Sequence, residues 1–113
     1  MQMQVGETGN GILLISLIGR LDTPGVDLIE TQLTARIVPR GARAIIDLSQ
    51  VSFMGSGGIR MFITIARAAA RKGGKLVVYG AQPLVAQVLE TTSLNAIVPV
   101  RADEATAVAV ARA

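Results

Sequence analysis

The sequence predicts an α/β fold built on a mixed, mostly parallel sheet. Short apolar runs typical of buried strands alternate with stretches of helical periodicity, and glycine or proline marks most boundaries between them. Strands that alternate with helices favour parallel pairing through right-handed crossovers. The chain has 113 residues, of which 50% are hydrophobic and 17% charged, so residues 1–113 are expected to form a single domain packed with about four helices.

The N-terminal segment predicts a β-hairpin at one edge of this sheet. Residues 2–5 alternate polar and apolar side chains, and residues 11–19 are an apolar run bounded by glycines. Residues 7–11 are the expected turn. Two strands that follow each other so closely pair antiparallel.

A helix is expected to begin at Thr23, with threonine as its cap and Pro24 in its first turn. Apolar residues then recur at helical spacing until residues 39–41 end the helix. The members of this apolar stripe are Val26, Ile29, Leu33 and Ile37.

The rest of the chain continues the alternation of strands and helices. We expect strands over residues 44–48, 75–79 and 96–100 and helices from Ile59 to Gly73, from Pro83 to about Glu90 and from Asp103 onward. Residues 49–58, which contain three glycines, are the expected loop between the third strand and the second helix.

The composition excludes many kinds of active site. The chain has no cysteine and no histidine, which removes disulfides, zinc sites, cysteine or serine–histidine nucleophiles and imidazole acid–base catalysis. The eight acidic residues are dispersed, and only Asp103 and Glu104 share a predicted loop. We therefore expect no enzyme activity, no metal site and no cofactor.

Charge and hydropathy argue against nucleic acid and membrane insertion. The net charge of +3 comes with only three aromatic residues for base stacking. The N-terminus has no pattern of a signal peptide, and no run reaches the roughly 18 apolar residues of a membrane span. These features predict a cytoplasmic protein.

The loops at the carboxyl ends of the parallel strands are the expected binding rim. They comprise residues 20–23, 49–58 and 80–82, so Asp22 and Ser56 should share this rim. Residues 55–58 precede a helix, where an anion such as a phosphate or a phosphorylated serine is favoured. The motif lacks the Gly-Lys-Ser/Thr of a nucleotide-binding loop, and the alternative is that Ser56 simply caps the helix.

The helix that follows carries two distinct faces. Arg60, Thr64, Arg67 and Arg71 lie on one stripe, which is expected to be solvated. Met61 and Ile65 lie on another flank, and two interpretations stay open for them. They either form an exposed apolar docking patch beside Ser56 or pack against a neighbouring helix.

Three motifs in the sequence resemble those of a known protein family. Residues 46–59, IDLSQVSFMGSGGI, closely resemble the signature of STAS domains, especially bacterial anti-sigma factor antagonists. Residues 19–23, GRLDT, are similar to the Gly-x-Leu-Asp turn of that family, and residues 74–78, GKLVV, to the entry of its fourth strand. The resemblance covers nearly the whole chain in matching order.

The resemblance implies a partner switch. Such an antagonist binds an anti-sigma factor that is also a serine kinase and thereby frees a sigma factor; phosphorylation of the signature serine releases it, and a serine phosphatase restores binding. Ser56 matches the phosphoacceptor. The residues expected to bind the partner are Asp22, Thr23, Gly55, Gly57, Gly58, Arg60 and Met61.

The sequence departs from the family pattern at two positions. Gly55 stands where the family commonly has aspartate, and Gly57 where it commonly has serine or threonine. These departures make a second interpretation relevant, in which the chain is a STAS-like accessory subunit on the cytoplasmic side of a membrane transporter for lipids or anions.

Overall fold

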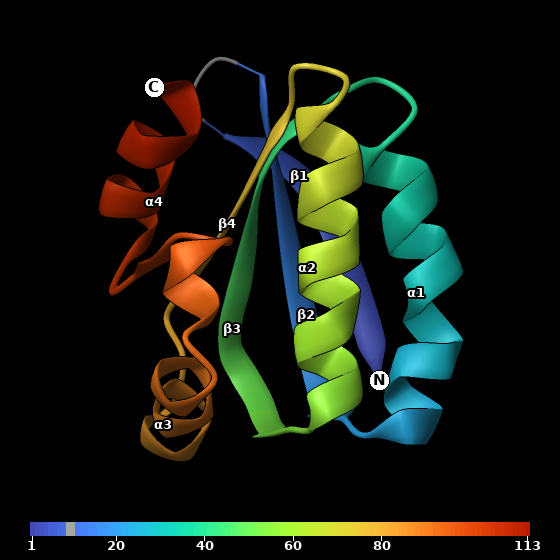
Figure 1. Ribbon diagram of the computed structural model, residues 1–113, viewed down its shortest axis with the longest axis vertical. Helices are drawn as coiled ribbons and strands as arrows, with labels where there is room; N and C mark the ends of the chain where they lie inside the picture. Colours follow the sequence, from blue (N-terminus) through green and yellow to red (C-terminus); the bar gives the residue numbers. More distant parts are fainter. Residues whose placement is uncertain (9–10) are drawn as a thin grey trace.

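The computed structural model describes residues 1–8 and 11–113 as a five-stranded sheet with helices on both faces (Figure 1). The strand order is β1-β2-β3-β4-β5; β1 is antiparallel to β2, and the other neighbouring pairs are parallel. The predicted α/β fold, with its mostly parallel sheet and its hairpin edge, is confirmed. Gly9 and Asn10 of the predicted hairpin turn lie outside the described residues.

The structure gives each element the following bounds. In chain order these are β1 (Gln2–Thr8), β2 (Ile12–Leu21), α1 (Thr23–Ile37), β3 (Arg43–Met54), α2 (Ser56–Ala70), β4 (Lys75–Tyr79), α3 (Pro83–Thr91), the 3₁₀ turn η1 (Leu94–Ala96), β5 (Val100–Arg101) and α4 (Glu104–Arg112).

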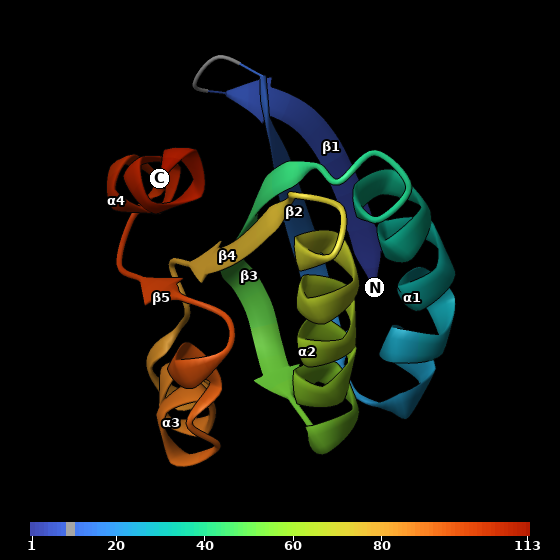
Figure 2. The same cartoon turned by 45° about the horizontal axis from the view of Figure 1, so that its top comes forward.

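Two hydrophobic clusters hold the layers together. The larger cluster joins one face of the sheet to α1, α2 and α3, while α4 packs on the opposite face (Figures 1 and 2). The smaller cluster under α4 consists of Ile12, Ile45, Val77, Tyr79, Ala107 and Ala111. Because β3 and β4 are covered on both faces, their central residues form continuous apolar runs rather than an alternating pattern.

The expected loop over residues 49–58 is wrong. Strand β3 continues through Met54 and α2 begins at Ser56, which leaves only Gly55 between them. A register shift against β2 lets Val51 and Met54 stay buried while the ring of Phe53 and three polar residues, Ser49, Gln50 and Ser52, are exposed. Those exposed polar residues had the composition of a loop although they form part of a strand.

The first helix is capped by Asp22 and not, as expected, by Thr23. The Asp22 carboxylate accepts a hydrogen bond from the backbone N–H of Gly25 at 2.9 Å, and Thr23 is the first helical residue. A carboxylate at this position reaches the N–H three residues along the chain, which otherwise has no partner within the helix.

The last strand is much shorter than the expected residues 96–100. Only Val100 and Arg101 pair with β4; of the expected strand, Ala96 belongs to the η1 turn, and residues 97–99 are irregular. Pro99 has no N–H to donate, and the N–H of Val100 is bound by the side chain of Asn95 at 2.8 Å. Both features limit the backbone groups available for a longer ladder.

Candidate functional site

Ser56 is the first residue of α2 and is exposed at the carboxyl end of the sheet. Gly55 occupies the cap position, and its carbonyl accepts hydrogen bonds from the N–H groups of Gly58 at 3.1 Å and Ile59 at 3.3 Å. The alternative in which Ser56 is the cap is therefore wrong. The Ser56 side chain is accessible to a binding partner.

A backbone hydrogen bond joins the two loops that were predicted to share the rim. The N–H of Gly55 donates to the carbonyl of Leu21 at 3.0 Å. Asp22 and Ser56 are the next residues in the chain after this bonded pair. The predicted proximity of their segments is confirmed. The third predicted loop, residues 80–82, lies beside the middle of β3 and not beside its end. Strand β4 ends next to Asp47, and Gln82 donates to the carbonyl of Ser49 at 3.0 Å.

The three glycines around Ser56 have different surroundings. A Cβ atom on Gly58 would lie 2.7 Å from the sulfur of Met54 and 3.2 Å from the Cβ of Leu21, whereas one on Gly57 would meet only Val26 at 3.9 Å. A Cβ atom on Gly55 would lie 3.3 Å from the ring of Phe53. Close packing therefore favours glycine at position 58, where a Cβ atom would displace the Met54 side chain, leaves room at position 57 and couples position 55 to the placement of Phe53.

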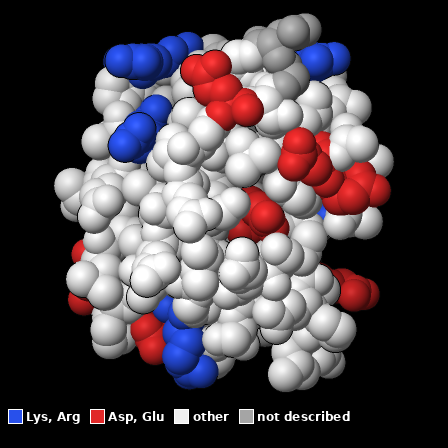
Figure 3. Space-filling model, turned by 180° about the vertical axis from the view of Figure 1, so that it is seen from behind, with Lys and Arg blue, Asp and Glu red and all other residues white. Residues whose placement is uncertain are grey.

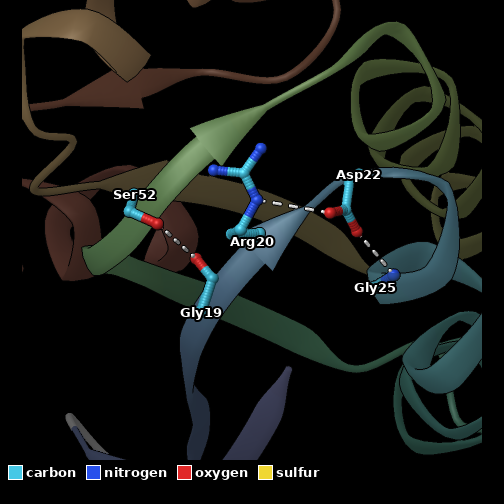
Figure 4. A network of polar contacts seen from close by, with 5 residues as sticks. All are labelled: Gly19, Arg20, Asp22, Gly25 and Ser52. Atoms are coloured by element: carbon cyan, nitrogen blue, oxygen red, sulfur yellow. Dashed lines mark hydrogen bonds and ion pairs between the residues drawn. The ribbon is translucent and has the colours of Figure 1, made fainter.

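Arg20 and Asp22 lie beside this loop (Figure 4). The Nε atom of Arg20 is 3.3 Å from the Asp22 carboxylate, and the guanidinium carbon is 4.5 Å from the centroid of the Phe53 ring. A cation over an aromatic face is attracted by the ring quadrupole. Phe53, which is 39% exposed, is thus held between Arg20 and the backbone at Gly55.

The hydrogen bonds of the Asp22 carboxylate stabilise its ionised form. Its pKa is lowered from the usual value, first by the hydrogen bond from the Gly25 N–H and also by the Arg20 side chain. The carboxylate serves the helix cap and the ion pair at once. Asp22 therefore combines a structural role with a place on the binding rim.

Arg60 is held by α1 across the surface of the two helices. Its two terminal nitrogens lie 3.1 and 3.2 Å from the two carboxylate oxygens of Glu30, a geometry in which both groups are matched fork to fork. These hydrogen bonds raise the pKa of Arg60. Thr64, Arg67 and Arg71 are exposed on the same stripe, as expected for a solvated face.

Met61 and Ile65 do not form a docking patch. Met61 is 0% and Ile65 1% exposed, and both belong to the main hydrophobic cluster. Helix α2 lies against the sheet with α1 at its side, so more than one of its faces is buried (Figure 1). The expectation that Met61 binds a partner is wrong, and the packing interpretation holds for both residues.

Sequence reasoning missed an apolar groove next to the rim. A groove of 410 Å³ lies between the end of β3 and α3 and is lined mainly by apolar side chains. Its walls include Phe53 and Leu84, the latter 74% exposed. Val85 and Leu89 are four positions apart and share the buried face of α3, whereas Leu84 lies off that face. This spacing is the one signal in the sequence for an unburied leucine.

Within residues 1–8 and 11–113, no group of three or more acidic side chains is placed to hold a metal ion. None of the helices in that part of the chain is both long and apolar enough to cross a bilayer. Seen from behind, basic side chains gather at the upper left and lie apart elsewhere near the margin, with acidic side chains between these places (Figure 3).

Comparison with known proteins agrees with this architecture. The model of the STAS domain family matches residues 5–107. An anti-sigma F factor antagonist from Paenibacillus polymyxa is 28% identical over 102 residues, which are 89% of this chain and 87% of that protein.

Two solved proteins have the same fold. An anti-sigma factor antagonist from Mycobacterium paratuberculosis superposes with a TM-score of 0.85 at 22% identity, covering 99% of this chain and 94% of the other. The unphosphorylated form of the anti-sigma factor antagonist SpoIIAA gives a TM-score of 0.78 at 22% identity, covering 98% and 96%. The phosphorylated form of SpoIIAA from Bacillus gives 0.68, also at 22% identity, covering 96% and 98%.

Proposed function

We propose that this chain, which belongs to the STAS domain family, is an anti-sigma factor antagonist that switches partners through Ser56. In its unphosphorylated form it binds an anti-sigma factor with serine kinase activity, and phosphorylation of Ser56 releases it. The observation that carries the proposal is the exposed position of Ser56 at the start of α2, beside the Asp22 segment. The relatives named as anti-sigma factor antagonists support the same reading.

The proposed cycle has two chemical steps. The kinase transfers the γ-phosphoryl group of ATP to the Ser56 hydroxyl oxygen, which loses its proton, and ADP leaves. A serine phosphatase then hydrolyses the phosphoester, so water restores the hydroxyl and inorganic phosphate departs. Neither step requires a catalytic group or a cofactor in this chain. The cycle implies a cytoplasmic location, because sigma factors act there on RNA polymerase.

Electrostatics explain why one phosphate is sufficient to reverse binding. A phosphoserine carries about −1.5 to −2 charges at neutral pH. On this rim it would lie close to the Asp22 carboxylate and to the apolar surface of Phe53. A dianion at that place opposes both the approach of an acidic partner surface and the desolvation of an apolar one.

The two departures from the family pattern fit this proposal differently. Gly57 has space for the larger residue that relatives carry, so the loop geometry does not depend on glycine there. At Gly55 the Phe53 ring lies next to the place that a side chain would occupy, and the guanidinium group of Arg20 lies over that ring. We infer that the partner of this chain meets a cation and an aromatic ring where other antagonists present an acid.

Binding measurements on Ser56 variants test the proposal. The tagged protein is purified from its native cells at low salt, the co-purifying kinase is identified by mass spectrometry, and its affinity for the variants is measured. Ser56→Asp is expected to weaken binding by on the order of tenfold to a hundredfold, whereas Ser56→Ala keeps the affinity and abolishes phosphate incorporation. Thr64→Asp, exposed two turns further along α2, is the matched charge control.

Two outcomes would overturn the proposal. Equal binding of the Asp and Ala variants would remove Ser56 from the switch. Recovery of a transporter ATPase and permease, with Ser56 unmodified, would instead identify the chain as an accessory subunit of a transporter.

A further inference from the structure

Arg60 lies within reach of Ser56 on the same helix. The two residues are four positions apart on α2, and both are exposed. Side chains at that spacing lie on one face, about 5–6 Å apart at their Cβ atoms. Helical side chains also lean toward the N-terminus, so Arg60 extends along the helix toward the turn that begins with Ser56.

In the unphosphorylated protein, the guanidinium group of Arg60 is turned to another helix. It binds Glu30 of α1 through two hydrogen bonds at 3.1 and 3.2 Å. Of the two ion pairs in the described part of the chain, this is the one that joins two helices, since the other pairs Arg20 at the end of β2 with Asp22 two residues further on. Arg60 is therefore both a neighbour of the phosphorylation candidate and a cross-link between α1 and α2.

We propose that phosphorylation of Ser56 makes Arg60 exchange Glu30 for the phosphate group. The inference rests on the proposed function, and it adds the residue that would hold the phosphorylated state. A phosphate dianion attracts a guanidinium more strongly than a carboxylate monoanion does and offers three acceptor oxygens for its fork of donors. The new contact lies within one helix, whereas the contact with Glu30 spans two.

The exchange has consequences for both helices. Glu30, which is half-buried, loses its cationic partner, so the ion pair across the surface of α1 and α2 is broken while their apolar packing remains. The phosphate is held along the side of α2, and part of its charge is compensated within the chain. The phosphorylated protein is thus expected to differ from the free protein along the α1–α2 surface as well as at the binding rim.

The other arginines serve as comparisons. Arg20 lies at the same end of the sheet as Ser56 but is held by a single longer contact with Asp22 and by the Phe53 ring. Arg67 is exposed on the same stripe as Arg60, about two turns further along, and so is too distant to reach the phosphate. A change at Arg67 removes the same charge without removing the proposed contact.

The test uses full-length protein with phosphoserine incorporated at position 56 during synthesis, so it does not depend on any kinase. Phosphorus NMR measures the second pKa of the phosphate, which is about 6 in a free phosphoserine. A bound guanidinium favours the dianion, so the pKa is expected to lie at least about 0.5 below that value. In Arg60→Gln it should return toward 6, while in Arg67→Gln it should stay as in the parent protein.

A fourth variant tests the exchange itself. Glu30→Gln frees Arg60 from its present partner, and the phosphate pKa should then fall below that of the parent phosphoprotein. Equal phosphate pKa values in Arg60→Gln and Arg67→Gln, or a rise in Arg20→Gln alone, would overturn the proposal. If Arg60 holds the phosphate but phosphorylation leaves kinase binding unchanged, the contact stands and the proposed function fails.

Discussion

At the scale of single residues, the three glycines around Ser56 differ in how much space the fold leaves for a side chain. Glycine is favoured at position 58 because a Cβ atom would displace the Met54 side chain and crowd Leu21, and Gly55 adjoins the ring of Phe53. Gly57 has open surroundings. The glycine cluster could be recognised in the sequence, but the tightly packed glycine could not, since the contact with Met54 depends on how β3 enters α2 and the contact with Leu21 arises only when β2 and β3 pair.

Substitution of these glycines should separate the roles. Gly58→Ala is expected to lower the free energy of unfolding by about 1–3 kcal/mol, because the added methyl group overpacks the contact with Met54. Gly57→Ala should change it by no more than about 1 kcal/mol, and in the stabilising direction, because alanine favours the helix. Urea unfolding curves of both variants provide the measurement. Equal midpoints would contradict the packing explanation.

At the scale of secondary-structure elements, the sequence predicted the extent of helix α3 more accurately than the end of strand β3. Helix α3 was expected from Pro83 to Glu90 and extends to Thr91. The expected third strand stopped six residues before the observed end of β3. A helix repeats its contacts every turn, whereas the end of a strand depends on the neighbour that pairs with it.

The orientation of α3 leads to a prediction about two of its leucines. Leu89 is 2% exposed in the main cluster, while Leu84 is 74% exposed at the groove. Leu89→Ala should therefore cost about 2–5 kcal/mol of unfolding free energy, and Leu84→Ala about 0.5 kcal/mol or less. Thermal and urea unfolding can compare them. A large loss from Leu84→Ala would mean that α3 packs with a different face.

At the scale of the whole molecule, the burial of Tyr79 results from elements distant in the chain. The tyrosine ends β4, and α4 covers it from the opposite face, so that only 6% of it is exposed. The side chain therefore serves packing between the sheet and α4. Burial, together with the negative charges of Asp47 and Glu104, raises the pKa of Tyr79 to about 12.

This pKa predicts how stability responds to alkaline pH. The unfolded chain releases the tyrosine proton near pH 10 and the folded protein only near 12, so the associated stability is complete below pH 10 and is lost between about pH 10 and 12. Tyr79 is the only tyrosine, so ultraviolet absorbance titration reports it alone. Native protein should titrate near 12 and urea-unfolded protein near 10; coincident curves would show that α4 does not cover the ring.

The sequence by itself determined the α/β class, the order of most elements, the hairpin edge and the meeting of the Asp22 and Ser56 segments. These follow from local periodicity and from the rule that parallel strands end at a common rim. Only the tertiary structure decided that Met61 is buried, that Arg60 binds Glu30 and that Phe53 and Leu84 border a groove. Such contacts join residues far apart in the chain, and their distances depend on how helices and strands pack rather than on the pattern within any one of them.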